Sequence, residues 1–137
     1  MSVRCRGDRG AECSCSPQRL ASFRDKLSRA LLDRFDLIVT VPRPRAAELE
    51  AGPSEASAPV RERVVAARER LRSAPARPTR AAEELLGRAV EQLPLSARGR
   101  ARVSRVAQTV AALAGVEEVE PPHVAEALAY RSHLDAA

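Results

Sequence analysis

Aromatic side chains are almost absent from this sequence of 137 residues, which has two phenylalanines, one tyrosine and no tryptophan. A core must therefore be built from alanine, valine and leucine, and each alanine buries little apolar area. A chain of this length holds one domain, or a small domain and a piece of another. We expect a small core of marginal stability.

Lysine is nearly missing as well. Lys26 is the only one, so the formal net charge of +5 comes almost entirely from arginine. Arginine binds phosphate and carboxylate through parallel N–H donors, which gives weak support to a polyanionic partner. A GC-rich genome would enrich arginine and alanine in the same way, and the aromatic platforms of single-strand binders are lacking.

Several segments that define common protein classes are also missing. No apolar run approaches the roughly 18 residues of a membrane span, and the start of the chain has no signal-peptide core, so we expect a cytoplasmic protein with no membrane partner. There is no G-x-x-x-x-G-K-[ST] loop, no G-x-S-x-G and no H-E-x-x-H. Nothing in these residues alone makes an active site.

The cysteines are three in number, Cys5, Cys13 and Cys15. In a reducing compartment they are thiols or metal ligands rather than disulfides. A structural zinc site usually has four ligands, and both histidines lie far along the chain, so the three sulfurs give an incomplete site.

The first third of the chain predicts a helix and a strand. Ser16 followed by Pro17 is typical of a helix start, and apolar spacing extends the helix over 17–33, with a possible break at Ser28. The run DLIVTV at 36–41 predicts a strand buried on both faces, as in a parallel sheet. Such a strand needs partners that these residues do not supply.

A Pro-rich linker at 43–58 separates this part from four predicted amphipathic helices. The first spans about 59–73, with Val60, Val64, Ala67 and Leu71 on its apolar face. The second covers the 80s and ends before Pro94, the third starts after a Ser96 cap and ends at Gly115, and the fourth spans about 122–134.

Two charged groups invite a functional interpretation. Asp33 and Arg34 stand just before the predicted strand and Asp36 begins it. They form either an ion pair at a helix end or a group with Arg34 directed at an anion on a neighbour. Arg98, Arg102 and Arg105 share one helix face, and Arg98 lies in the first turn, where unpaired N–H groups favour a phosphate. Periodicity alone favours a solvated basic face, and a DNA-facing helix is a third option.

Three segments in order carry a family resemblance: CSCSPQRLASFRDKLSRALLDRFDLIVTVPRP, LSARGRARVSRVAQTVAALAG and VEPPHVAEALAYR. Together they resemble the C-terminal part of magnesium-chelatase-like AAA+ ATPases, the ComM/YifB-type competence-related family. The resemblance implies a mainly α fold: a four-helix AAA+ lid-type bundle preceded by a helix–strand remnant of an α/β ATPase core. It divides the chain into a core remnant at 1–42, the linker at 43–58 and the lid at 59–137.

The resemblance also implies roles for single residues. The arginine of LLDRFDL, Arg34, resembles the arginine finger that reaches the γ-phosphate held by the next subunit of a hexameric ring. Asp33 and Asp36 would hold its guanidinium, Arg98 of LSAR resembles the sensor-2 arginine, and Arg105 would support the same face. A complete ATPase would bind ATP and Mg²⁺. A zinc site at Cys5, Cys13 and Cys15 is doubtful because it is incomplete.

The sequence departs from the family at its start. Met1 and Val3 stand where the family has the sensor-1 asparagine and the first cysteine, and Arg29 replaces a glycine before the finger. The family's Walker motifs lie upstream, so we expect a C-terminal fragment that is inactive alone and completes other ATPase subunits. The alternatives are a small basic adaptor that binds DNA or a partner ATPase, and a decaying gene product that folds poorly.

Overall fold

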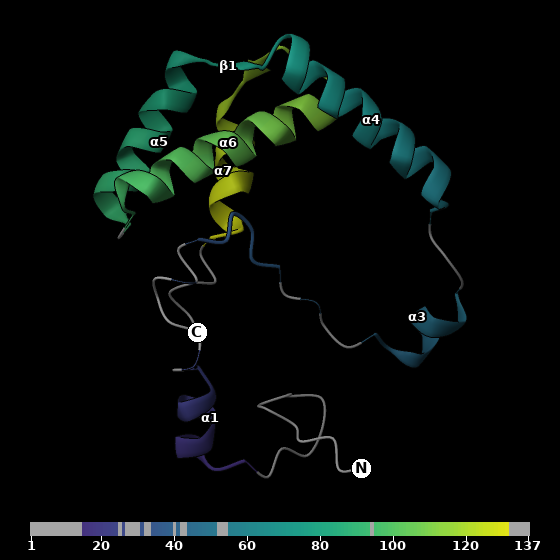
Figure 1. Cartoon of the computed structure of the whole chain (residues 1–137), viewed down its shortest axis with the longest axis vertical. Coiled ribbons are helices and arrows are strands. Elements are labelled where there is room, and N and C mark those ends of the chain that lie inside the picture. Colours follow the sequence, from purple (N-terminus) through teal and green to yellow (C-terminus); the bar gives the residue numbers. More distant parts are fainter. Residues whose placement is uncertain are drawn as a thin grey trace.

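The computed structural model describes residues 15–24, 26, 31, 34–39, 41, 44–51, 55–93 and 95–131. Four helices form a bundle (Figure 1): α4 (Ser57–Ser73), α5 (Arg80–Gln92), α6 (Ala97–Ala114) and α7 (Pro121–Ala129). The mainly α, lid-type bundle predicted from the sequence is confirmed. No helix within the described ranges is long and apolar enough to cross a membrane.

Local sequence signals set the helix ends. The Ser96 hydroxyl accepts from the Gly99 amide at 3.0 Å and starts α6, and Gly115 ends it in the left-handed region at φ 78°. Glycine adopts that conformation without a Cβ penalty, so both predicted caps of α6 are confirmed. Thr79 caps α5 in the same way, through a 3.3 Å bond from the Ala82 amide.

The core is small and rich in alanine, as the composition predicts. Val103 is the largest fully buried side chain. It belongs to a cluster, mostly of alanine and valine, from α5, α6, α7, β2 and the residue before β1: Ala76, Ala82, Leu86, Val103, Val106, Ala107, Ala111, Val119, Val124 and Ala127. Small side chains allow α6 and α7 to pack closely.

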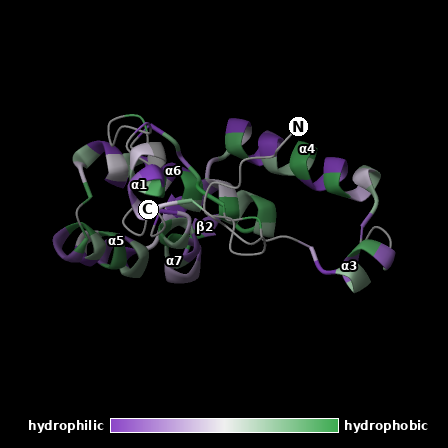
Figure 2. Cartoon of the chain, turned by 90° about the horizontal axis from the view of Figure 1, so that it is seen from below, coloured by the Kyte–Doolittle hydropathy of each residue, from purple (hydrophilic) through white to green (hydrophobic). Residues whose placement is uncertain are grey.

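The predicted apolar face of α4 was wrong for its first half. Ala67 is buried, but Val60 and Val64 are exposed. The reason is visible in Figures 1 and 2, where the first part of α4 extends away from α5, α6 and α7. The last part of α4 does contact α6, where Arg70 Nη1 donates to the Ala112 carbonyl at 3.1 Å. This bond satisfies a carbonyl near the negative end of α6.

Three further features differ from the predicted elements. The segment between α4 and α5 contains a two-residue strand, β1 (Arg77–Pro78), which pairs in parallel with β2 (Glu118–Val119), between α6 and α7. A short helix, α3 (Ala46–Glu50), lies within the predicted linker. The last helix ends at Ala129 rather than near 134, because the chain turns at Tyr130.

The N-terminal part is only partly as predicted. Helix α1 (Pro17–Arg24) starts at the expected cap, with the Arg19 amide 3.3 Å from the Ser16 hydroxyl. The described residues of 36–41 form no strand, and Leu37, Val39 and Val41 are exposed. The expected double burial was wrong, because no sheet in the described part of the chain offers these residues backbone partners.

Candidate functional site

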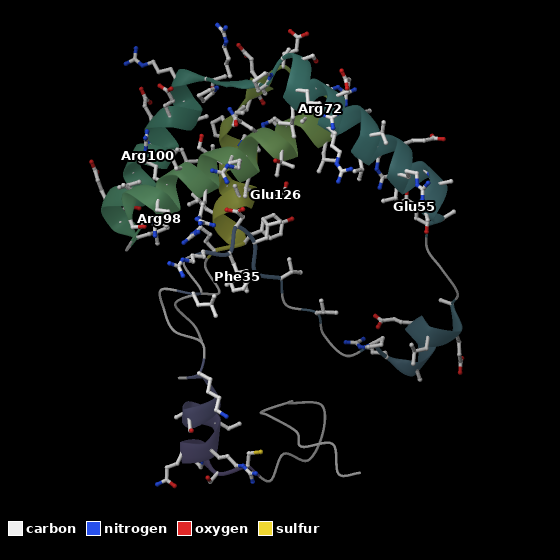
Figure 3. All side chains as sticks on the ribbon, in the orientation of Figure 1. Phe35, Glu55, Arg72, Arg98, Arg100 and Glu126 are labelled. Carbon is white, nitrogen blue, oxygen red and sulfur yellow. The ribbon has the colours of Figure 1, made fainter. Side chains whose placement is uncertain are left out.

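The segment that carries Arg34, here called the Arg34 segment (residues 34–39), lies against α6. Arg102 on α6 makes the contact: its Nη1 donates to the backbone carbonyl of Arg34 and, at 2.9 Å, to Oδ1 of Asp36. Phe35 lies between these two acceptors in the sequence, and Figure 3 shows it below the end of α7. One guanidinium therefore holds both sides of Phe35.

A backbone hydrogen bond ties the same segment to the end of α7. The Ile38 amide donates to the Tyr130 carbonyl at 3.1 Å. The Tyr130 hydroxyl in turn donates to Glu126 Oε1 at 3.0 Å, and this bond to a carboxylate raises the pKa of the phenol. The Arg34 segment is thus anchored to two helices that pack against each other.

Arg34, the candidate arginine finger, has a side chain that can contact another molecule. The side chain of Arg34 is exposed, and within the described residues no ion pair joins it to a carboxylate. Asp36, which we expected to hold the Arg34 guanidinium, pairs with Arg102 instead. Asp33 and Arg29 lie outside the described residues. An exposed guanidinium on an anchored backbone can present donors to an anion on another molecule.

Arg98 lies one turn before Arg102, in the first turn of α6. Its side chain is exposed, directly after the Ser96 cap. The first backbone N–H groups of a helix have no intrahelical partner, and the helix dipole favours negative charge there. The position suits contact with a phosphate oxygen.

The predicted basic face of α6 is only partly solvated. Arg98 and Arg105 are exposed, but the Arg102 side chain is only 17% exposed because the Arg34 segment covers it. Sequence reasoning missed this role for Arg102. Asp36 and Arg102 stand 66 positions apart, and no local pattern links them.

A shallow hollow of about 370 Å³ lies between α5 and α6, on a different side of α6. Its lining includes the apolar Leu86 and Ala101 and the oppositely charged Arg100 and Glu83. Figure 3 shows Arg98 and Arg100 near the start of α6. Neither Arg34 nor Arg98, the two candidate phosphate-binding residues, lines this hollow.

The cysteine site cannot be assembled from what the structure describes. Cys15 is half-buried just before α1, whereas Cys5 and Cys13 lie outside the described residues. Across the described ranges, no three His, Cys, Asp or Glu side chains cluster as metal ligands would.

Removing the cap before Arg98 is expected to destabilise the bundle. Ser96→Ala deletes the oxygen that accepts from the Gly99 amide, so we expect the free energy of unfolding to fall by about 1 kcal/mol. Urea denaturation followed by circular dichroism measures it. The matched control is Ser73→Ala, because that hydroxyl donates only to the Glu69 carbonyl at the exposed end of α4. Equal losses in both variants would contradict the capping role.

Comparison with family models gives two matches along the chain. A model described as magnesium chelatase, subunit ChlI C-terminal, matches residues 54–131. A second, described as magnesium chelatase, subunit ChlI, matches residues 2–49. The first match covers α4 to α7, and the second includes the Arg34 segment.

Individual relatives give the same picture. The chain is 34% identical to the Competence protein ComM of Haemophilus influenzae over 140 residues, covering 90% of this chain and 28% of that protein. It is 30% identical to the protein YifB of Salmonella typhimurium, covering 86% of this chain and 27% of the relative. An uncharacterized protein of Mycobacterium bovis is 37% identical, covering 88% of this chain and 28% of that protein. The chain thus spans about a quarter of the length of these relatives.

Proposed function

Because this chain belongs to the magnesium chelatase ChlI family and corresponds to the C-terminal region of a magnesium-chelatase-like ATPase, we propose that it completes ATP-hydrolysing sites in a ring of subunits. Residues outside these 137 would hold the nucleotide. This chain would contribute two arginines that touch phosphate.

Arg34 would act as the arginine finger in trans. Its exposed side chain projects from a backbone that is anchored to α6 and α7, and this observation carries the proposal. A fixed guanidinium supplies donors where negative charge develops on the transferring phosphoryl group. An anchored backbone limits the cost of ordering that side chain when the neighbouring subunit docks.

Arg98 would act as the sensor-2 residue, contacting nucleotide phosphate from the lid. Its support is its place in the first turn of α6, where the exposed side chain and the positive end of the helix dipole favour the same anion. Bound ATP and Mg²⁺ would supply the phosphoryl group and its charge neutralisation. Arg34 and Arg98 fit such a ligand because both are exposed cations, whereas Cys15 alone gives no basis for zinc.

The partners would be AAA+ subunits, full-length or N-terminal, in a hexameric ring. One relative is named as a competence protein, which supports a link to DNA remodelling during DNA uptake. The basic adaptor remains the second candidate, since Arg98 and Arg105 are exposed on one face of α6. It would bind DNA with an affinity that falls steeply with salt, measured by fluorescence anisotropy, and neutralising both arginines would abolish the binding.

A chimaera tests the proposal directly. In it, this chain replaces the aligned region of the Haemophilus influenzae relative, and ATP hydrolysis is measured. We expect the chimaera to hydrolyse ATP and the 137-residue chain to be inactive. Hydrolysis by the chain alone would overturn the proposal.

Arg98→Ala in the chimaera is expected to raise KM for ATP roughly ten- to a hundredfold, because a hydrogen bond to a charged group contributes about 1.5–3 kcal/mol. The control is Arg100→Ala, which changes an exposed arginine of the same helix that lines the hollow instead. An unchanged KM in Arg98→Ala would remove the sensor-2 role while leaving the finger in place.

A further inference from the structure

We propose that Arg102 is a positioning residue that fixes the Arg34 segment to the sensor-2 helix, so that the two phosphate-facing arginines move as one unit. The inference rests on the proposed function for its consequence in catalysis. Its structural content rests on the contacts of Arg102 with residues 34 and 36.

The chemistry of the contact suits a fixed joint. A single Nη1 atom of Arg102 donates to a backbone carbonyl and to a carboxylate, one on each side of Phe35. Hydrogen bonds between ionised groups are stronger than neutral ones, and this one is shielded on the Arg102 side, where the side chain is 17% exposed, although the Asp36 side chain is 43% exposed. The backbone at residue 34 is therefore held directly, while its side chain stays exposed.

The position of Arg102 links this joint to Arg98. The two residues are four apart on α6, which places them on the same face about 6 Å apart along the axis. A rigid helix therefore connects the candidate sensor-2 residue to the backbone of the candidate finger. The bond from the Ile38 amide to Tyr130 adds a second anchor and prevents the segment from pivoting about Arg102.

The guanidinium has no alternative anchor in the described part of the chain. Its Nε is buried there without a hydrogen-bond partner, so Nη1 makes the polar contacts that place it. Losing the Arg34 segment would break both hydrogen bonds of Nη1, one of them between ionised groups, and this favours the attached state. A displaced segment would misplace Arg34, and a shift of about 1 Å can lower a rate about 100-fold.

The first test uses the 137-residue chain and hydrogen exchange at the Ile38 amide. Arg102→Ala is expected to speed exchange there at least about tenfold. Asp36→Ala, a change outside the bundle, is expected to speed it less, because the bond from Arg102 to the Arg34 carbonyl remains. Arg80→Ala is the matched control: Arg80 also makes a 2.9 Å ion pair, with Glu84, but is 93% exposed. Unchanged exchange at Ile38 in Arg102→Ala and Asp36→Ala would overturn the proposal.

The second test uses the chimaera and separates this proposal from the proposed function. Arg102→Ala is expected to lower kcat about 10- to 100-fold with little change in KM or melting temperature, and Arg102→Lys to restore part of it. A merely structural role would lower the melting temperature together with kcat. If Arg34→Ala lowers kcat and Arg102→Ala does not, the positioning role is wrong and the finger stands. If Arg34→Ala has no effect on kcat, both the finger role of Arg34 and the catalytic consequence of Arg102 are wrong.

Discussion

Replacing Arg34 by alanine in the chimaera is expected to lower kcat for ATP hydrolysis by about 10³–10⁵-fold, with a small effect on KM. An arginine finger acts on charge that develops in the transition state, so its loss appears in kcat rather than in ATP binding. The size reflects a guanidinium that projects from a backbone anchored in advance. Steady-state hydrolysis over a range of ATP concentrations measures both parameters.

The control for Arg34 is Arg45→Ala. Arg45 is also exposed and lies just before α3, outside the Arg34 segment. We expect its loss to leave kcat within a factor of about two of the unchanged chimaera, since its side chain makes no phosphate contact in the proposal. Arg34→Lys should rescue little, because a lysine ammonium cannot reproduce the planar fork of donors.

Action in trans gives a sharper form of the same prediction. Mixing Arg34→Ala subunits with subunits that keep Arg34 but cannot bind ATP should restore hydrolysis, because the intact finger reaches the neighbour's nucleotide. A finger acting within its own subunit would leave the mixture inactive. That result would contradict the ring arrangement even if Arg34 proved essential.

Val103→Asp is the second large effect that we expect, and it concerns folding. Val103 is 0% exposed and lies at the centre of the small-residue cluster of the bundle. An aspartate there would bury a carboxylate among apolar neighbours, at a cost of at least about 3 kcal/mol. Small domains have free energies of unfolding near the low end of about 5–15 kcal/mol, so the variant should lose most of its cooperative unfolding transition.

The matched control is Val65→Asp, the same change at a position on α4 that is 59% exposed. We expect the free energy of unfolding of this variant to lie within about 0.5 kcal/mol of that of the unchanged chain. Urea denaturation of both variants, followed by circular dichroism, gives the comparison. The deficit of Val103→Asp should shrink toward about pH 4, because the protonated carboxyl is neutral and the buried site disfavours only the charged form. Similar stability of the two variants would contradict the assignment of the core.

The sequence by itself determined the features that depend on residues within about one helical turn. Apolar spacing located α4, α5, α6 and α7, and the signals at Ser16, Ser96 and Gly115 fixed helix ends that the structure confirms. Each of these depends on the local backbone: a hydroxyl three residues from an amide, or a glycine free to adopt positive φ. The family resemblance in LLDRFDL and LSAR was also readable, because it is carried by contiguous residues.

Only the tertiary structure decided how distant residues meet. It paired Asp36 with Arg102 rather than Arg34, left Val60 and Val64 of α4 exposed, and joined Arg77–Pro78 to Glu118–Val119. A charged residue on a periodic face looks the same in sequence whether it faces water or another segment. The free energy that selects its partner comes from burial and from hydrogen bonds between parts of the chain far apart in sequence, which no local pattern encodes.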